Sequence, residues 1–151
     1  MLEWCRSSVA RVADDEGVAV EAKGNVDLHP TSGYRHVTIV EPGRLVFFAG
    51  QMPVDDTGEH VVGAGDLEAQ VDRTVENTRR ALRAAGARPE DVVRSVVYVV
   101  SQDHEVLARA WHHFLASDIG RALTSASTLV GVSALGFPDQ LVELELTAAL
   151  S

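Results

Sequence analysis

The C-terminal segment, residues 125–150, constrains the fold more than any other part of this chain. It contains two runs of strand-forming residues on either side of a Gly-Phe-Pro-Asp turn at Gly136–Asp139. In the second run Glu143 and Glu145 alternate with apolar residues, and successive side chains of a strand point to opposite faces. We therefore expect one face of this strand to meet a core. The other face carries two carboxylates, either on a solvated surface or in a polar cleft.

Hydrophobic patterns predict seven elements from residue 36 onward, in the order strand, strand, helix, strand, helix, strand, strand. Apolar residues at every third or fourth position predict the helices, and β-branched runs predict the strands. The expected helices cover 67–85 and 104–116, and the expected strands cover 36–40, 45–49, 92–100 and both sides of the 136–139 turn. Two helices can cover one face of a sheet, so the predicted fold class is α+β.

The first predicted helix has clear end signals. Asp66 is a favoured N-cap residue, and Gly86 suits the left-handed conformation that often follows a helix. Residues 1–32 carry weaker signals: Val18–Ala22 fits a short strand, and Asp14–Gly17 fits a turn.

The apolar run Leu45–Ala49 is predicted to be a strand that is covered on both faces. It contains two adjacent phenylalanines, Phe47 and Phe48, so at least one of them points away from the helices. An apolar sheet face that has no helix of its own is typical of a partner surface. We therefore expect a homo-oligomer in which copies of the chain cover one another's sheets.

Composition indicates one globular domain and disfavours several classes of function. The 151 residues are enough to bury a sizeable core, and the net charge of −9 disfavours binding to a phosphate backbone. No stretch approaches the ~20 apolar residues of a membrane span, and the N-terminus lacks the apolar run of a signal peptide. A single cysteine, Cys5, allows no intrachain disulfide, which is consistent with a cytoplasmic location.

Three histidines, His104, His112 and His113, raise the question of a metal site. His112 and His113 are adjacent, so they point to different faces of the predicted helix. Neither a cysteine nor a second histidine at the i, i+4 spacing completes a ligand set. We therefore expect no metal.

Several segments occur in an order and with a spacing that match one known family. They are Gly33–Val37, Gly43–Pro53, Asp66–Gln70 with Asn77, Ala84–Ala87, Asp91–Val99, Ala126–Val132 and Val142–Glu145. Together they span residues 33–149. On these segments the chain resembles the Rid family, the reactive intermediate deaminases that are also called YjgF or L-PSP-like proteins.

The resemblance implies a chorismate-mutase-like α+β sandwich, with one mixed sheet and two helices on one face. It implies a homotrimer whose sheets pack around a central barrel, with clefts between subunits that hold a small-molecule ligand. It divides the chain into an N-terminal extension, residues 1–32, and a Rid-like domain, residues 33–151. Deaminase members hydrolyse imines and enamines and release ammonia without a metal or organic cofactor, so we expect no cofactor.

The resemblance also assigns candidate site residues. Glu143 matches the carboxylate that positions the attacking water, and Tyr34 matches the tyrosine of the family cleft. Ala49 and Gly50 match a Ser-Gly-Gln segment. Gly50 is expected either to form only a bulge or to offer its backbone N–H as a donor to a carbonyl or oxyanion. Independently of the resemblance, we expect Glu145 to have a structural role.

Ser127 and Thr128 are expected to hydrogen-bond the polar group of the ligand, and Ser127 departs from the family pattern. Deaminase members carry an arginine in a Pro-Ala-Arg-Ser segment, where it binds the substrate carboxylate; here Ser127 stands at that position. Arginine grips a carboxylate with two charge-assisted bonds, whereas serine offers one neutral donor. Arg35 or Arg121 would have to replace it from a nearby loop or a neighbouring subunit.

These features lead to one main function and two alternatives. The main function is hydrolysis of an imine, an enamine or a related small carbonyl compound, with Glu143 activating water and Tyr34 closing the cleft. The missing arginine favours the first alternative, a non-catalytic relative that binds a metabolite and regulates or scavenges. The second alternative, an endoribonuclease or translation inhibitor, is disfavoured by the acidic charge.

Overall fold

The computed structural model describes residues 10–11, 20–23, 28–41 and 43–150. Its strands are β1 (Ala10–Arg11), β2 (Val20–Lys23), β3 (Val37–Val40), β4 (Arg44–Phe47), β5 (Val92–Val100), β6 (Ala126–Val132) and β7 (Val142–Leu150). Its helices are α1 (Leu67–Ala85) and α2 (His104–Ala116), with short 3₁₀ helices at Pro89–Asp91 and Gly120–Thr124. From β3 onward the order of long helices and strands is the predicted one.

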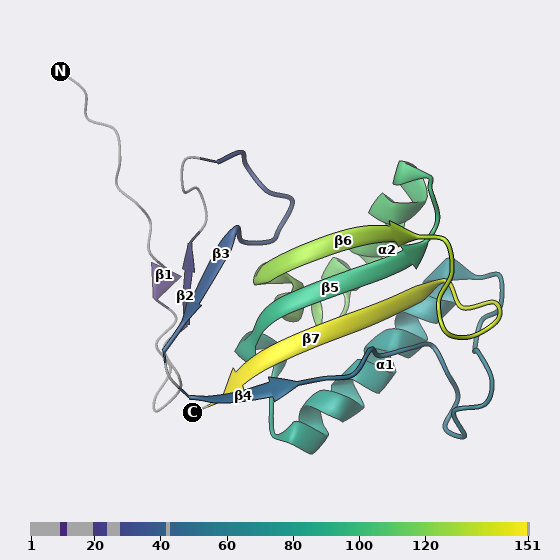
Figure 1. The fold of residues 1–151 in the computed structure, drawn as a ribbon, viewed down its shortest axis with the longest axis horizontal. Helices are drawn as coiled ribbons and strands as arrows, with labels where there is room; N and C mark the ends of the chain where they lie inside the picture. The colour runs from purple at the N-terminus through teal and green to yellow at the C-terminus, as the bar shows by residue number, and fades with distance from the viewer. Residues whose placement is uncertain (1–9, 12–19, 24–27, 42, 151) are drawn as a thin grey trace.

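Four strands form a mixed sheet in the order β4-β7-β5-β6 (Figure 1). Strands β4 and β5 run antiparallel to β7, while β5 and β6 are parallel and are joined through α2. Both helices lie on one face of this sheet (Figure 1). The predicted α+β class, with one mixed sheet and two helices on one face, is therefore confirmed.

A separate three-stranded antiparallel sheet has the order β1-β2-β3. It meets the main sheet at the start of β6, where Arg35 N–H donates to the Ser125 carbonyl and Ala126 N–H donates to the Thr38 hydroxyl. Pairing with β2 places β3 in this second sheet, outside the main one. The β2 strand overlaps the predicted short strand, whereas the predicted turn at Asp14–Gly17 lies outside the described residues.

The core lies between the four-stranded sheet and its two helices. Phe114 of α2, Leu82 of α1 and Leu144 of β7 are among its fully buried side chains. Strand β7 buries alternate residues from Val142 onward, as its sequence predicts. Within the described ranges, neither long helix combines the length and the apolar character that crossing a bilayer requires.

The ends of α1 are where the sequence places them. The Asp66 carboxylate accepts a hydrogen bond from Ala69 N–H at 3.0 Å, so Asp66 is the N-cap. Gly86 has a φ of 70°, a left-handed conformation that a residue without Cβ adopts at little cost.

The face of the main sheet opposite the helices is open in the single chain (Figure 1). Leu45 and Phe47 of β4 point onto this open face and are 55% and 76% exposed, whereas Phe48 packs against the core. The prediction that one of the two phenylalanines points away from the helices is confirmed. The prediction that residues 45–49 are covered on both faces is wrong within the chain. The reason is that β4 is an edge strand that pairs with β7 alone, and both helices lie on the other face.

Replacing Asp66 by alanine should destabilise the fold by about 1 kcal/mol, because the first turn of α1 loses the acceptor for one of its free N–H groups. Urea unfolding followed by circular dichroism measures this change. Glu90→Ala removes the same charge from an exposed residue and should change the free energy of unfolding by less than about 0.5 kcal/mol. Equal losses in the two variants would contradict the capping role.

Candidate functional site

Gly50 lies at a bulge beside β7, next to Glu143. The backbone N–H groups of Phe48 and Gln51 donate to two β7 carbonyls that are two residues apart, at 3.0 and 2.8 Å. Three residue steps on one side therefore match two on the other, which is the spacing of a β-bulge. The bulge takes Ala49 and Gly50 out of the regular ladder.

The side chain of Glu143 fills the space that a side chain at Gly50 would occupy. A Cβ atom placed on Gly50 would lie 1.8 Å from Glu143 Oε1 and 2.6 Å from its Cδ. Only glycine lets the carboxylate rest against the backbone here. The structure thus brings together Glu143 and Gly50, two of the residues that the sequence singles out.

Gln140 holds the other oxygen of the same carboxylate. This glutamine is 3% exposed. Its Nε2 donates to Glu143 Oε2 at 3.1 Å and to the Val142 carbonyl at 3.0 Å, while its Oε1 accepts from Phe137 N–H at 3.1 Å. Sequence reasoning missed Gln140. Its place at the end of the Gly-Phe-Pro-Asp turn, three residues before Glu143, was the available signal.

Glu145 belongs to a different group on the open face. The Tyr98 hydroxyl donates to Glu145 Oε2 at 3.2 Å, and an Arg94 guanidinium nitrogen lies 3.6 Å from Glu145 Oε1. Burial, and then the charge of Glu145, raise the pKa of Tyr98 because both disfavour the phenolate. The fold therefore favours the neutral phenol. This contribution to stability is present below about pH 10 and is lost as the pH rises through the raised pKa.

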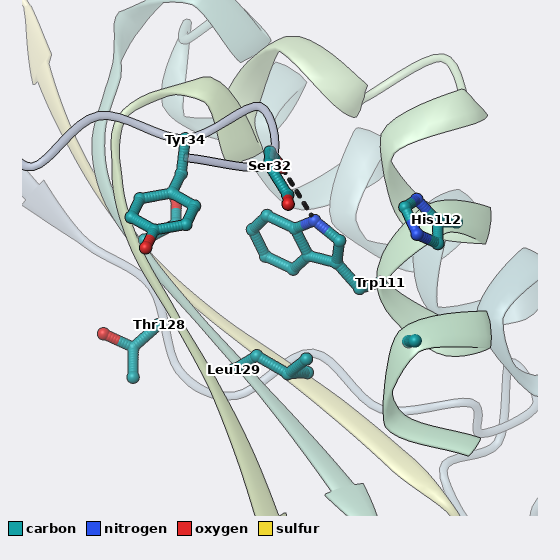
Figure 2. Close-up of a pocket in the computed structure, with 8 residues that line it drawn as sticks. Ser32, Tyr34, Trp111, His112, Thr128 and Leu129 are labelled. Carbon is teal, nitrogen blue, oxygen red and sulfur yellow. Dashed lines mark hydrogen bonds between the residues drawn. The ribbon is translucent and has the colours of Figure 1, made fainter. Parts of the chain in front are cut away.

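A second group of candidate residues lines a pocket of about 460 Å³ at the edge of the sheet, between β6, α2 and the loop before β3. Figure 2 labels the lining residues Ser32, Tyr34, Trp111, His112, Thr128 and Leu129. Ala108 and Ser127 complete the lining. The Tyr34 and Trp111 rings meet edge to face with centroids 6.2 Å apart, and Trp111 Nε1–H donates to the Ser32 carbonyl at 3.1 Å. Two rings are thus held in fixed positions at the pocket.

Ser127 and Thr128 belong to this pocket but point to opposite faces of β6. The Ser127 hydroxyl donates to the Leu123 carbonyl at 3.0 Å and lies 2.5 Å from the Ser95 hydroxyl, on the helix side. Thr128 is exposed, and its hydroxyl makes no hydrogen bond with any other described residue. Ser127 therefore has its proton engaged by the protein, whereas Thr128 keeps a free donor and acceptor.

The candidate residues form two groups within one chain. Glu143 pairs with Tyr98 across β5–β7, and Thr128 pairs with Val96 across β5–β6. Two strand spacings and two residue steps separate Glu143 from Thr128, which corresponds to roughly 12 Å between Cα atoms. The Glu143–Gly50 group and the pocket group are therefore two separate groups within a single chain.

The pocket contains no described arginine. Arg35 and Arg121 are both exposed, and neither side chain is part of the lining. The arginine absent at Ser127 is therefore not replaced within the described part of the chain.

The histidines of α2 differ in their surroundings. His112 lines the pocket and is exposed, while His113 Nε2 lies 2.6 Å from Asp72 and joins α2 to α1. In the described segments, no group of three or more histidine, cysteine or acidic side chains is arranged to hold a metal ion.

Comparisons with known proteins point to one family. The family model described as Endoribonuclease L-PSP matches residues 25–150. A RutC family protein of Pyrococcus abyssi is 43% identical over 61 residues, which is 40% of this chain and 46% of the relative. The 2-iminobutanoate/2-iminopropanoate deaminase of Salmonella typhimurium is 36% identical over 64 residues, 42% of this chain and 48% of the relative. The matched segments thus span about half the length of these two relatives.

A solved structure extends the likeness to nearly the whole fold. A member of the conserved Rid protein family from Yersinia pestis, of unknown function, is 32% identical and has a TM-score of 0.75. The match covers 87% of this chain and 98% of that one.

Glu145→Gln should lower the pKa of Tyr98, because it removes the adjacent negative charge while leaving the burial of the phenol largely in place. An ultraviolet absorbance titration in a Tyr34→Phe background follows Tyr98 alone, since the chain has two tyrosines. Glu143→Gln should give a smaller fall, because Glu143 is the weakest of the contributions. An unchanged pKa in Glu145→Gln would contradict the contact.

Proposed function

The chain belongs to the Endoribonuclease L-PSP family, the Rid or YjgF family, and on that premise we propose that it hydrolyses small imines or enamines. The proposed product is a carbonyl compound with release of ammonia. The reaction takes place in clefts between copies of the chain. The Salmonella relative named as an imine deaminase supports this class of reaction.

The position of Glu143 is the observation that carries the proposal. One carboxylate oxygen accepts from Gln140, and the other lies directly over Gly50 at the bulge. A carboxylate that is held in one orientation, next to a residue that has no side chain, is suited to bind a water molecule and accept its proton. A carboxylate on a solvated strand face is usually hydrogen-bonded to water. It requires neither a buried glutamine as a partner nor a glycine that leaves room for its side chain.

The chemistry then follows in two steps. Glu143 accepts a proton from water while the water oxygen attacks the imine carbon, and passes this proton to the imine nitrogen to give a carbinolamine. In the second step Glu143 accepts the proton of the carbinolamine hydroxyl and delivers it to the nitrogen as the carbon–nitrogen bond breaks, so that ammonia and the carbonyl compound leave and the carboxylate is regenerated. The backbone N–H at Gly50 lies outside the regular ladder and is suited to donate to the polar group of the substrate.

The two groups of candidate residues suggest how the cleft is built. The Glu143 group lies on the open face beside edge strand β4, and the pocket group lies at the opposite edge, β6. A cyclic oligomer places different surfaces of neighbouring copies in contact. In the proposed trimer, the Glu143 group of one copy therefore meets the pocket group of the next. The open apolar face supplies the contact area.

Ribonuclease activity, which the family description also names, is not proposed. The net charge of −9 opposes the approach of a phosphate backbone.

Replacing Phe47 by aspartate should prevent assembly, because a charge on the open face cannot be buried without a partner. Sedimentation should give the native protein about three times the 16.2 kDa mass of one chain, and the variant the mass of one chain. Val62→Asp places the same charge on another exposed apolar residue, in the loop before α1, and should leave the mass unchanged. A native protein that sediments as a single chain would contradict the shared cleft.

Replacing Glu143 by glutamine should slow imine hydrolysis by about a hundredfold or more, the usual contribution of a positioned general base. Ammonia release from 2-iminopropanoate and from an uncharged ketimine, each compared with buffer alone, measures the rate.

Two further variants sharpen the assay. Gly50→Ala should lose activity as well, since its methyl group would displace the Glu143 carboxylate. Glu145→Gln, the same change two residues along the same face, should retain activity within about threefold. Absence of acceleration by the native protein with either imine would overturn the enzymatic proposal and leave a metabolite-binding protein.

A further inference from the structure

We infer that the pocket at the β6 edge selects an uncharged molecule with a flat aromatic ring and one polar group, and discriminates against carboxylates. This inference deepens the proposed function by naming the substrate class of its cleft. It rests on that function only for the reaction, because the selection itself is a property of binding.

The shape of the pocket favours a flat ring. Trp111 is 6% exposed and its indole is tied to the Ser32 carbonyl, so the ring cannot rotate away without breaking that bond. Tyr34 stands edge to face against it, and Leu129 adds an apolar wall (Figure 2). Aromatic ligands gain most from such offset or edge-on contacts with fixed rings. The volume of about 460 Å³ lies within the usual range for small-molecule sites.

The pocket also offers hydrogen-bonding groups that have no partner in the protein. The Tyr34 hydroxyl, the Thr128 hydroxyl and the His112 ring make no hydrogen bond with other residues in the described part of the chain. The Tyr34 and Thr128 hydroxyls can each donate and accept, so they suit an amide, imine or carbonyl group that has both kinds of atom. Ser127 contributes little to such recognition, since its proton is donated to Leu123.

Charge is what the pocket lacks. None of its described lining residues is an arginine, lysine, aspartate or glutamate, and the histidine is the one lining residue that can take up a proton. A carboxylate that enters loses hydration and finds no cation to replace it. The net charge of −9 adds a field that repels anions at longer range. An uncharged isostere meets neither obstacle.

Benzamide and benzoate form a matched pair of probes, because they have the same size and ring and differ in charge. Trp111 reports their binding by fluorescence in a Trp4→Phe background, since the chain has two tryptophans. We expect benzamide to bind at least tenfold more tightly than benzoate in the assembled protein. Thr128→Val, which keeps the shape and removes the hydroxyl, should weaken benzamide binding about fivefold.

A charge-insertion variant tests the cause. Ala108 is exposed on α2 and lines the pocket, so Ala108→Arg places a cation there on a residue whose side chain is not part of the core. We expect benzoate to bind about tenfold more tightly to this variant, with benzamide changed by less than about twofold. Far-ultraviolet circular dichroism confirms that the variants are folded.

Two outcomes would overturn the inference. One is benzoate binding as tightly as benzamide to the native pocket; loss of that binding in Arg35→Ala would then identify the cation. The other is no change in Trp111 fluorescence with millimolar benzamide. Failure of imine hydrolysis is a separate result, because benzamide binding with no turnover sustains this inference while removing the proposed reaction.

Discussion

The rest of the structure depends on one constraint: the two helices lie on the same side of the four-stranded sheet and cover only one of its faces. Both helices cover the same face, so Leu45 and Phe47 remain on an open face that also carries Glu143 and the Tyr98–Glu145 pair. Burying an aromatic side chain of this kind contributes about 2 kcal/mol per copy. The same face thus provides a reason to assemble and carries the carboxylate that the proposed chemistry needs.

The open face also explains why a single chain shows only parts of a site. Glu143 is held by Gln140 and shaped around Gly50 at one side of the sheet, while Tyr34, Trp111 and Thr128 surround a pocket at the other. Each group is held by its own contacts, and neither contains both the Glu143 carboxylate and the pocket. In the proposed trimer, assembly brings the two groups together. The pocket would then select the substrate, and the carboxylate would carry out the proposed reaction.

Local rules were enough to predict the elements and the fold class. Alternation along β7, the apolar stripe of α1 and the end signals at Asp66 and Gly86 depend on near neighbours in sequence, and the structure has them as predicted. The contact between Gly50 and Glu143 could not be derived from local rules alone. It depends on the pairing of β4 with β7 and on one extra residue at the bulge, which are long-range features. The family resemblance, and not the local pattern, brought both residues into the candidate site.

The orientation of the two β6 hydroxyl residues follows from a local rule, whereas the exposure of β4 does not. The period of two in a strand already places Ser127 and Thr128 on opposite faces, so only one of them could share the face of Glu143. The exposure of β4 was harder to predict, because an apolar run has the same sequence pattern whether its faces are buried by the same chain or by another one. Likewise β3 pairs with β2, and the residue pattern of β3 does not predict which strand is its neighbour.

Mixing two inactive variants tests most directly whether the site is shared between copies. Glu143→Gln disables one group and Tyr34→Ala disables the other, and native mass spectrometry confirms that both chains enter the mixed assemblies. If the cleft joins the Glu143 group of one copy to the pocket of the next, equal mixing should restore about a quarter of the native rate of imine hydrolysis. Mixed assemblies that remain as inactive as the separate variants would show that the two groups do not act across copies.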